Sequence, residues 1–202
     1  CRSFRCGTSF FIDPYTLPIN PKMDYQKIID RHYPLSPLRD TLMIHSRAVA
    51  GMALDIVRRR SLDVDPAFVE EAAMLHDIGI FLTDAPSIHC HGSLPYICHG
   101  VEGARLMREA GFPRHALVCE RHTGAGLTVD DIMRQHLPLP LRDMTPQTLE
   151  EKLICYADKF FSKSGELAAP KPIDKVIRQM EAHGPDTLRR FLELHDLFFK
   201  LN

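Results

Sequence analysis

Apolar side chains recur at steps of three and four residues along most of the chain, which is the spacing of one buried face of an α-helix. The clearest run follows Ser36 and Pro37, which suit the N-cap and the first position of a helix. The positions on this face are Leu38, Leu42, His45, Val49, Met52 and Ile56. The pattern predicts a long helix whose buried face carries one histidine.

Further helices are expected where proline marks a start or glycine marks an end. They cover residues 65–79, 96–110, 113–120, 147–161, 172–184 and 185–200. Loops are expected at 80–95, 123–145 and 162–171. No segment shows the sustained alternation of apolar and polar residues that a half-buried strand requires. The predicted fold class is therefore all-α.

The chain has 202 residues, which suits one domain with a sizeable core. Residues 1–22 carry three prolines and no helical period, so we expect them to form an irregular extension outside the folded body. Residues 23–202 are expected to form the domain, with its main motifs at about 36–162 and C-terminal helices at 172–200. A melting temperature measured after deletion of 1–22 tests this division.

Charge and cysteine content exclude some classes of protein. The 25 Lys and Arg residues nearly balance the 26 Asp and Glu residues, which argues against nucleic acid or a membrane surface as the partner. No apolar run approaches the roughly 20 residues of a membrane span. The six cysteines form no compact framework, so we read them as reduced thiols in a cytoplasmic protein, with Cys119 and Cys155 in the core. The oligomeric state is left open.

Histidine is unusually frequent, with 11 in the chain, and it is the commonest metal ligand in proteins. The strongest signal is the pair His76-Asp77 at the end of a predicted helix, because both side chains are good ligands for a divalent ion. Adjacent helical residues point about 100° apart, so one ion could meet both only at the helix end, with further ligands from other helices. The candidates for these further ligands are His45, His99, His122 and Asp158.

In the order of these residues the chain resembles the HD superfamily of metal-dependent phosphohydrolases, in its HDIG subgroup. The local motifs are also similar: His76-Asp77-Ile78-Gly79, His99-Gly100-Val101-Glu102-Gly103-Ala104, Arg121-His122-Thr123-Gly124-Ala125-Gly126 and Ala157-Asp158-Lys159. They are similar both to bacterial diadenosine tetraphosphate hydrolases of this superfamily and to uncharacterised archaeal and bacterial HDIG proteins. The resemblance covers roughly residues 36–162.

The resemblance implies a single helical bundle that holds two divalent transition-metal ions, such as iron or manganese. It implies that the first ion is bound by His45, His76, Asp77 and Asp158, and the second by His99 and His122, with Asp77 bridging the two. His76 and Asp77 would be the catalytic residues at its centre. His45 has an alternative interpretation as an ordinary core histidine, and Asp158 as a helix N-cap or a surface carboxylate. His99 and His122 could instead be ordinary polar residues of a protein that binds one metal ion.

One departure concerns the substrate. HDIG proteins often carry a lysine directly after the glycine, where this chain has Ile80. The positive charge for a substrate phosphate would then come from Arg47, Arg121 or Lys159, each of which could equally be a structural or solvated charge. The group His89-Cys90-His91, with Cys98 nearby, suggests either an extra zinc site or a loop at the pocket mouth. The other histidines are expected to be ordinary: His32, His115, His136, His183 and His195.

The leading functional hypothesis is a metal-dependent phosphohydrolase that acts on a nucleotide or a small phosphate ester, with a dinucleoside polyphosphate as the favoured example. A phosphodiesterase acting on a cyclic or linear nucleotide is a related alternative. Two further alternatives are a non-catalytic module that senses nucleotides or metal, slightly favoured by Ile80, and a two-iron oxygenase.

Overall fold

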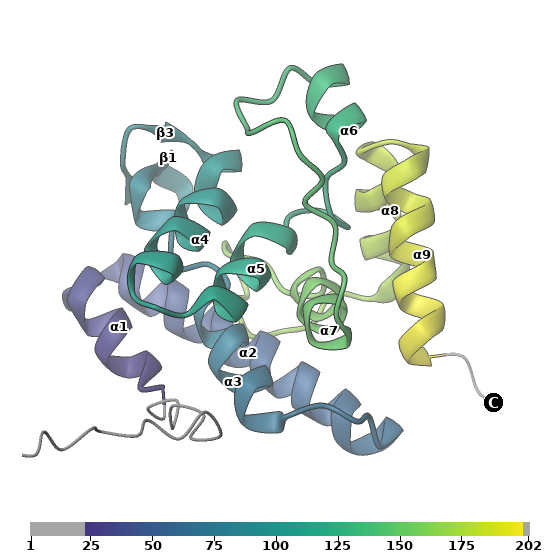
Figure 1. Ribbon diagram of the computed structural model, residues 1–202, viewed down its shortest axis with the longest axis horizontal. Coiled ribbons are helices and arrows are strands. Elements are labelled where there is room, and N and C mark those ends of the chain that lie inside the picture. The colour runs from purple at the N-terminus through teal and green to yellow at the C-terminus, as the bar shows by residue number, and fades with distance from the viewer. Residues whose placement is uncertain (1–22, 200–202) are drawn as a thin grey trace, which may run out of the picture.

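The computed structural model describes residues 23–199, which form a helical body with one small sheet (Figure 1). The predicted extension at 1–22 lies outside the described residues. The α-helices are α1 (Tyr25–His32), α2 (Pro37–Arg60), α3 (Pro66–Leu75), α4 (His99–Glu109), α5 (Pro113–Arg121), α6 (Val129–Arg134), α7 (Leu149–Asp158), α8 (Ile173–Ala182) and α9 (Pro185–Phe199). The strands are β1 (Thr83–Ala85), β2 (Cys90–His91) and β3 (Leu94–Pro95). The all-α prediction is confirmed in substance, because the strands are only two or three residues long.

The long helix α2 begins and ends where its capping residues predict. The Ser36 hydroxyl accepts a hydrogen bond from the Arg39 backbone N–H, and Pro37 occupies the first turn. At the other end Ser61 adopts a left-handed conformation, with φ of 48°, and its N–H reaches back to the last turn. Leu42, His45 and Val49 are fully buried or nearly so, as the helical spacing predicts. Helix α2 therefore carries His45 into the interior.

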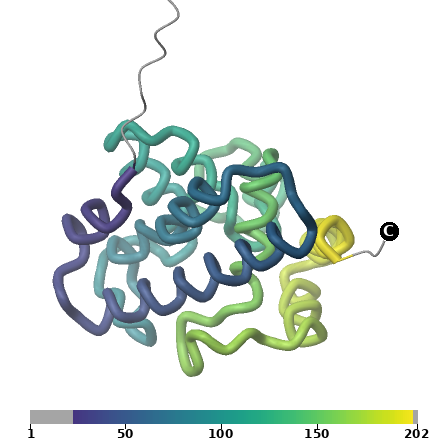
Figure 2. Tube along the Cα trace, turned by 90° about the horizontal axis from the view of Figure 1, so that it is seen from below, coloured from purple at the N-terminus to yellow at the C-terminus, as the bar shows by residue number. Residues whose placement is uncertain are grey.

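The helices pack in groups around this interior. Helix α2 packs against α3 and α7, and α4 packs against α5. Figure 2 shows α2 running along one side of the body. Helices α8 and α9 lie together at one end of the molecule, where α9 contacts α7 (Figure 1). Tyr156 of α7 anchors them: its ring stacks on Phe191, and its hydroxyl lies 2.8 Å from Nδ1 of His195.

The structure differs from the predicted elements at four places. Helix α1 lies outside every predicted helix. Helix α3 stops at Leu75, so residues 76–79 form a turn rather than the last helical turn. The predicted loop 80–95 contains the sheet, in the order β2-β1-β3, with β1 antiparallel to β2 and parallel to β3. The predicted loop 123–145 contains α6, which a capping box of Thr128 and Asp131 begins. These elements are too short to produce a periodic pattern.

Other expectations from the sequence are met in the core. Cys119 and Cys155 are fully buried, as predicted. The four cysteines between residues 23 and 199 are all free of disulfide bonds. None of the helices in this part of the chain combines the length and the hydrophobicity needed to cross a membrane.

Candidate metal centre

Five separate segments bring the six predicted ligands together in the interior. His45 lies within α2, and His76 and Asp77 form the turn after α3. His99 begins α4, His122 directly follows α5, and Asp158 is the last residue of α7. All six side chains are buried. The early end of α3 matters here, because the turn lets two adjacent residues face the same interior point.

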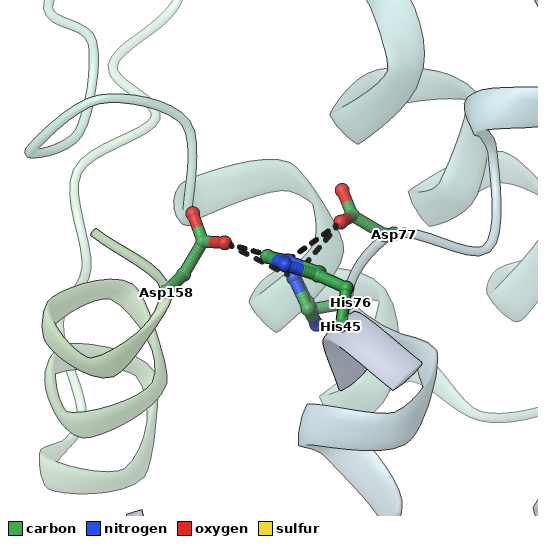
Figure 3. Close-up of side chains that lie close together, drawn as sticks. All are labelled: His45, His76, Asp77 and Asp158. Carbon is green, nitrogen blue, oxygen red and sulfur yellow. Dashed lines mark hydrogen bonds and ion pairs between the residues drawn. The ribbon is translucent and has the colours of Figure 1, made fainter. Parts of the chain in front are cut away.

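The first group of donors is His45, His76, Asp77 and Asp158. His45 Nε2 lies 3.0 Å from Asp158 Oδ1 and 3.3 Å from Asp77 Oδ2. His76 Nε2 lies 3.1 Å from the same Asp77 oxygen and 3.4 Å from Asp158 Oδ1. Figure 3 shows the two imidazoles between the two carboxylates. Four donor atoms thus converge from two helices, α2 and α7, and from the turn after α3.

The second group shares Asp77 with the first. Asp77 Oδ1, the oxygen that faces away from His45 and His76, lies 3.5 Å from His99 Nε2 and 3.4 Å from His122 Nε2. The carboxylate of Asp77 therefore presents one oxygen to each group. This is the grouping that the family resemblance implied for two ions with a bridging carboxylate.

Backbone carbonyls set the tautomers of three histidines. Nδ1 of His76 lies 2.6 Å from the Ala73 carbonyl oxygen, Nδ1 of His99 lies 2.7 Å from that of Tyr96, and Nδ1 of His122 lies 2.8 Å from that of Cys119. A carbonyl oxygen only accepts, so each Nδ1 carries the hydrogen and donates it. Nε2 of His99 and of His122 is left with a bare lone pair that points to the interior, and Nε2 of His76 faces the two carboxylates. Metal-binding imidazoles are commonly oriented in this way.

The inward lone pairs give a direct test of whether a metal ion fits. The Nε2 atoms of His99 and His122 face each other 3.1 Å apart. Burial lowers the pKa of His99 to about 3 and also lowers that of His122, so neither ring carries a second proton at neutral pH. Two lone pairs at this distance repel unless a cation lies beside both. Within residues 23–199, His76 Nε2 and Asp77 Oδ1 also form no hydrogen bond. The donor set fits a divalent cation.

The electrostatics of the site are dominated by its buried carboxylates. Burial alone would raise the pKa of Asp77, but His76 and Lys163 outweigh it and hold that pKa well below its usual range. Burial would likewise raise the pKa of Asp158, and Lys159 with Lys163 holds it low. For His76 burial opposes protonation, yet the two carboxylates raise its pKa to about 9. His76 and the two lysines therefore supply positive charge beside these carboxylates.

Lys163 is the residue of this site that the sequence analysis missed. Its Nζ lies 2.8 Å from Asp77 Oδ2 and 3.8 Å from Asp158 Oδ1. Burial would lower its pKa, but the carboxylates of Asp77 and Asp158 raise it well above the ordinary value. Lys163 lies five residues after Asp158, in a segment without helical spacing, so no pattern marked it. Its short distance in sequence from a predicted ligand was the one available signal.

The three basic residues predicted to contact a substrate phosphate lie in different surroundings. Lys159 is at the site: its Nζ lies 2.5 Å from Asp158 Oδ2 and donates to the His122 carbonyl oxygen at 3.0 Å. Arg121 instead pairs with the buried carboxylate of Glu151 at 2.9 Å. Arg47 is exposed on α2. The structure thus brings one of the three to the metal centre.

The other residues considered in the sequence lie outside the two groups of donors. His89 and His91 are exposed, and Cys90 is buried in β2. None of these belongs to a group of potential metal ligands within the described residues. Ile80 is fully buried and follows the turn that carries Asp77, so this position belongs to the core. His183, predicted to be ordinary, lines a cavity beside the metal centre.

Comparison with known proteins agrees with this geometry. The model of the HD domain family matches residues 42–162, so the chain belongs to the HD domain family. An uncharacterized protein of Methanocaldococcus jannaschii is 32% identical over 161 residues, which are 78% of this chain and 87% of that protein. No solved structure gave a significant match.

Two further relatives are much longer than the matched region. They are tRNA (cytidine(56)-2'-O)-methyltransferases of Picrophilus torridus, 29% identical, and Thermoplasma volcanium, 28% identical. The alignments cover 78% and 77% of this chain but 41% of each methyltransferase. The similarity to these enzymes is thus confined to less than half of their length.

Proposed function

We propose that this chain is a metal-dependent phosphohydrolase that acts on a nucleotide or another small phosphate ester. The observation that carries the proposal is the position of Asp77 inside an HD domain. Its two oxygens face two separate groups of buried donors, with His45 and His76 on one side and His99 and His122 on the other. A carboxylate placed in this way suits a pair of ions.

The donor set also indicates the kind of metal. His45, His76 and Asp158 would hold one ion with Asp77, and His99 and His122 would hold the other with the same carboxylate. A mixture of imidazoles and carboxylates suits iron, manganese or a similar ion better than calcium. When bound, such ions supply Lewis acidity at a phosphoryl oxygen and lower the pKa of water. The chain's contribution is to fix four Nε2 atoms and two carboxylates before substrate arrives.

Lys163 supplies the phosphate-facing charge that Ile80 does not. Its ammonium group reaches Asp77 and Asp158 and also lines a cavity of about 520 Å³ beside the centre. A buried ammonium in this position would bind phosphoryl oxygens and stabilise the charge that develops on them. Lys159 is already held by Asp158 and by the His122 carbonyl, so we assign it to positioning Asp158.

The same residues bear on the alternative functions. The sensing module drew its support from the missing lysine at Ile80, and Lys163 removes that support. A two-iron oxygenase would use the same donors, so only the reaction that is measured distinguishes it from a hydrolase.

The net charge of the chain is near zero, so we propose a small phosphorylated molecule rather than nucleic acid as the partner. We also propose the cytoplasm as the location of the protein. Methyl transfer is not part of the proposal.

A phosphate-release screen over nucleotides and simple phosphate esters, with added manganese or iron, tests the proposal. Release should require metal, and Asp77→Asn should abolish it. Asp84→Asn, an exposed carboxylate in β1, is the matched control and should keep full activity. Activity that survives in Asp77→Asn would contradict the mechanism. Oxygen consumption by the reduced iron form, without phosphate release, would favour the oxygenase instead.

A further inference from the structure

The cavity beside the metal centre extends well beyond the metal ligands. Its lining includes Asp158 and Lys163 at the centre, Phe161 and Ser162 in the segment after α7, and residues of α8. Its volume of about 520 Å³ lies in the range of small-molecule pockets. Gln179, Met180 and His183 of α8 and its C-terminal end form the far wall. Helix α8 lies after residue 162, where the HD family match ends, so this wall is a feature of the C-terminal helices.

The cavity lining carries an excess of positive charge, although the chain as a whole has a formal charge of −1. Its lining includes Lys159, Lys163 and Lys171 and a single acidic residue, Asp158. Lys159 pairs with Asp158, and Lys163 pairs with Asp77. Lys171 is therefore the lysine of this lining whose charge is not balanced by a carboxylate in the residues that the structure describes.

Lys171 is held in place by neutral groups. Its Nζ donates to the amide oxygen of Gln179 at 3.1 Å, and its backbone N–H donates to the Phe160 carbonyl oxygen at 2.7 Å. Burial lowers its pKa, and the neighbouring charges of Lys159 and Lys163 lower it further, against the opposing effect of Asp158. A partly buried cation without a counter-charge is costly. An anionic group in the cavity would remove that cost.

We propose that Lys171, together with Gln179 and His183, forms a subsite for a second anionic group of the substrate. Lys163 would meet the phosphoryl group beside the metal centre, and Lys171 would meet a phosphate further along the same cavity. The inference rests on the proposed function and makes it narrower: the substrate class becomes phosphate compounds that carry at least two linked phosphates. Simple monophosphates would lack the contact with α8.

Binding of two phosphonates that a phosphohydrolase cannot cleave tests the subsite without turnover. The full-length protein is titrated calorimetrically with methylenediphosphonate and with methylphosphonate, which differ by one anionic group. The wild type should bind the diphosphonate more tightly. Lys171→Met should weaken diphosphonate binding about tenfold or more, because a charge-assisted hydrogen bond is lost, and should leave methylphosphonate binding unchanged.

Lys175→Met is the matched control, since Lys175 is an exposed lysine of α8, four residues after Lys171, that does not line the cavity. Gln179→Leu is a second variant, which should reduce the preference for the diphosphonate in a protein that keeps Lys171. An unchanged preference in Lys171→Met, or an equal loss in Lys175→Met, overturns the subsite. Failure of every phosphate compound in the release screen, with the diphosphonate preference intact, overturns the proposed function alone.

Discussion

The ammonium group of Lys163 lies 2.8 Å from Oδ2 of Asp77, in the interior of the protein. That oxygen also faces His45 and His76, so the lysine contacts the same atom as two predicted metal ligands. Together with His76, this lysine from another segment holds the pKa of the buried Asp77 carboxyl well below its usual range. The same lysine opens onto the cavity where a substrate would lie.

Lys163→Met should lower kcat/KM for phosphate release by about 10²-fold, because a buried donor to the developing charge is removed. The bound metal should not decrease, since Lys163 competes with a cation for Asp77 Oδ2 rather than helping to hold it. Steady-state kinetics and elemental analysis on the same preparation measure both quantities. Lys152→Met, a partly exposed lysine of α7, should match the wild type. Unchanged kcat/KM in Lys163→Met would refute the role of this lysine.

The number of metal ions bound per chain should depend on which of the two groups of donors is intact. Elemental analysis of the dialysed wild type should give more than one transition-metal ion per chain. His122→Gln should lose about one ion, because it removes a donor from the second group alone. Asp77→Asn should lose more, because it weakens both groups. His91→Gln changes an exposed histidine and should have no effect. Equal metal content in the wild type and His122→Gln would argue against a second ion.

Two glycine substitutions should change stability in opposite directions. A Cβ at Gly79 would lie 2.3 Å from the His99 carbonyl oxygen and 2.5 Å from the Gly103 backbone nitrogen, so Gly79→Ala must push the Asp77 turn away from α4. A Cβ at Gly51 of α2 meets nothing within 4 Å, so Gly51→Ala should stabilise by about 0.5–1 kcal/mol. Urea unfolding measures both. If Gly79→Ala is as stable as the wild type, the close packing of the turn against α4 is wrong.

The buried His115 should make the protein less stable in mild acid. It lies between Phe68 and Phe112, and burial, with a smaller effect of Arg114, lowers its pKa to about 4. Glu71 Oε2 is 3.4 Å from Nε2 without forming a hydrogen bond, so burial outweighs it. The unfolded chain, with a histidine pKa of about 6.5, binds this proton more readily. The contribution of His115 to the unfolding free energy is therefore fully present above about pH 6.5, and it is lost as the pH falls toward 4.

The loss attributable to His115 should amount to about 2–3 kcal/mol between these limits. His115→Gln removes the titrating group, so its unfolding free energy should fall less steeply between pH 7 and 4. His91→Gln replaces an exposed histidine and should keep the slope of the wild type. Equal slopes in His115→Gln and the wild type, from denaturant unfolding at each pH, would contradict the predicted low pKa.

The sequence predicted what periodicity and capping determine. Helix α2 begins at Pro37 and buries His45 because Ser36 caps it and its apolar residues repeat with the helical period. Helix α6, with six residues, and strands of two or three residues are too short for any period to be read. Lys163 could not be placed because its position depends on the path of the irregular segment after α7, which is set by tertiary packing. Arg121 is the opposite case: it is adjacent to His122 in the sequence, but its guanidinium pairs with Glu151 and does not reach the metal centre.

The donors of the metal centre come from segments as far apart in the chain as His45 and Asp158. An ion held by the first group of donors would act as a cross-link between α2, α7 and the turn at Asp77. A ligand that binds only the folded form adds about 2.7 kcal/mol of stability at one hundred times its Kd. The cellular lifetime of this protein should therefore depend on metal supply, with metal-starved cells degrading it faster than metal-replete ones.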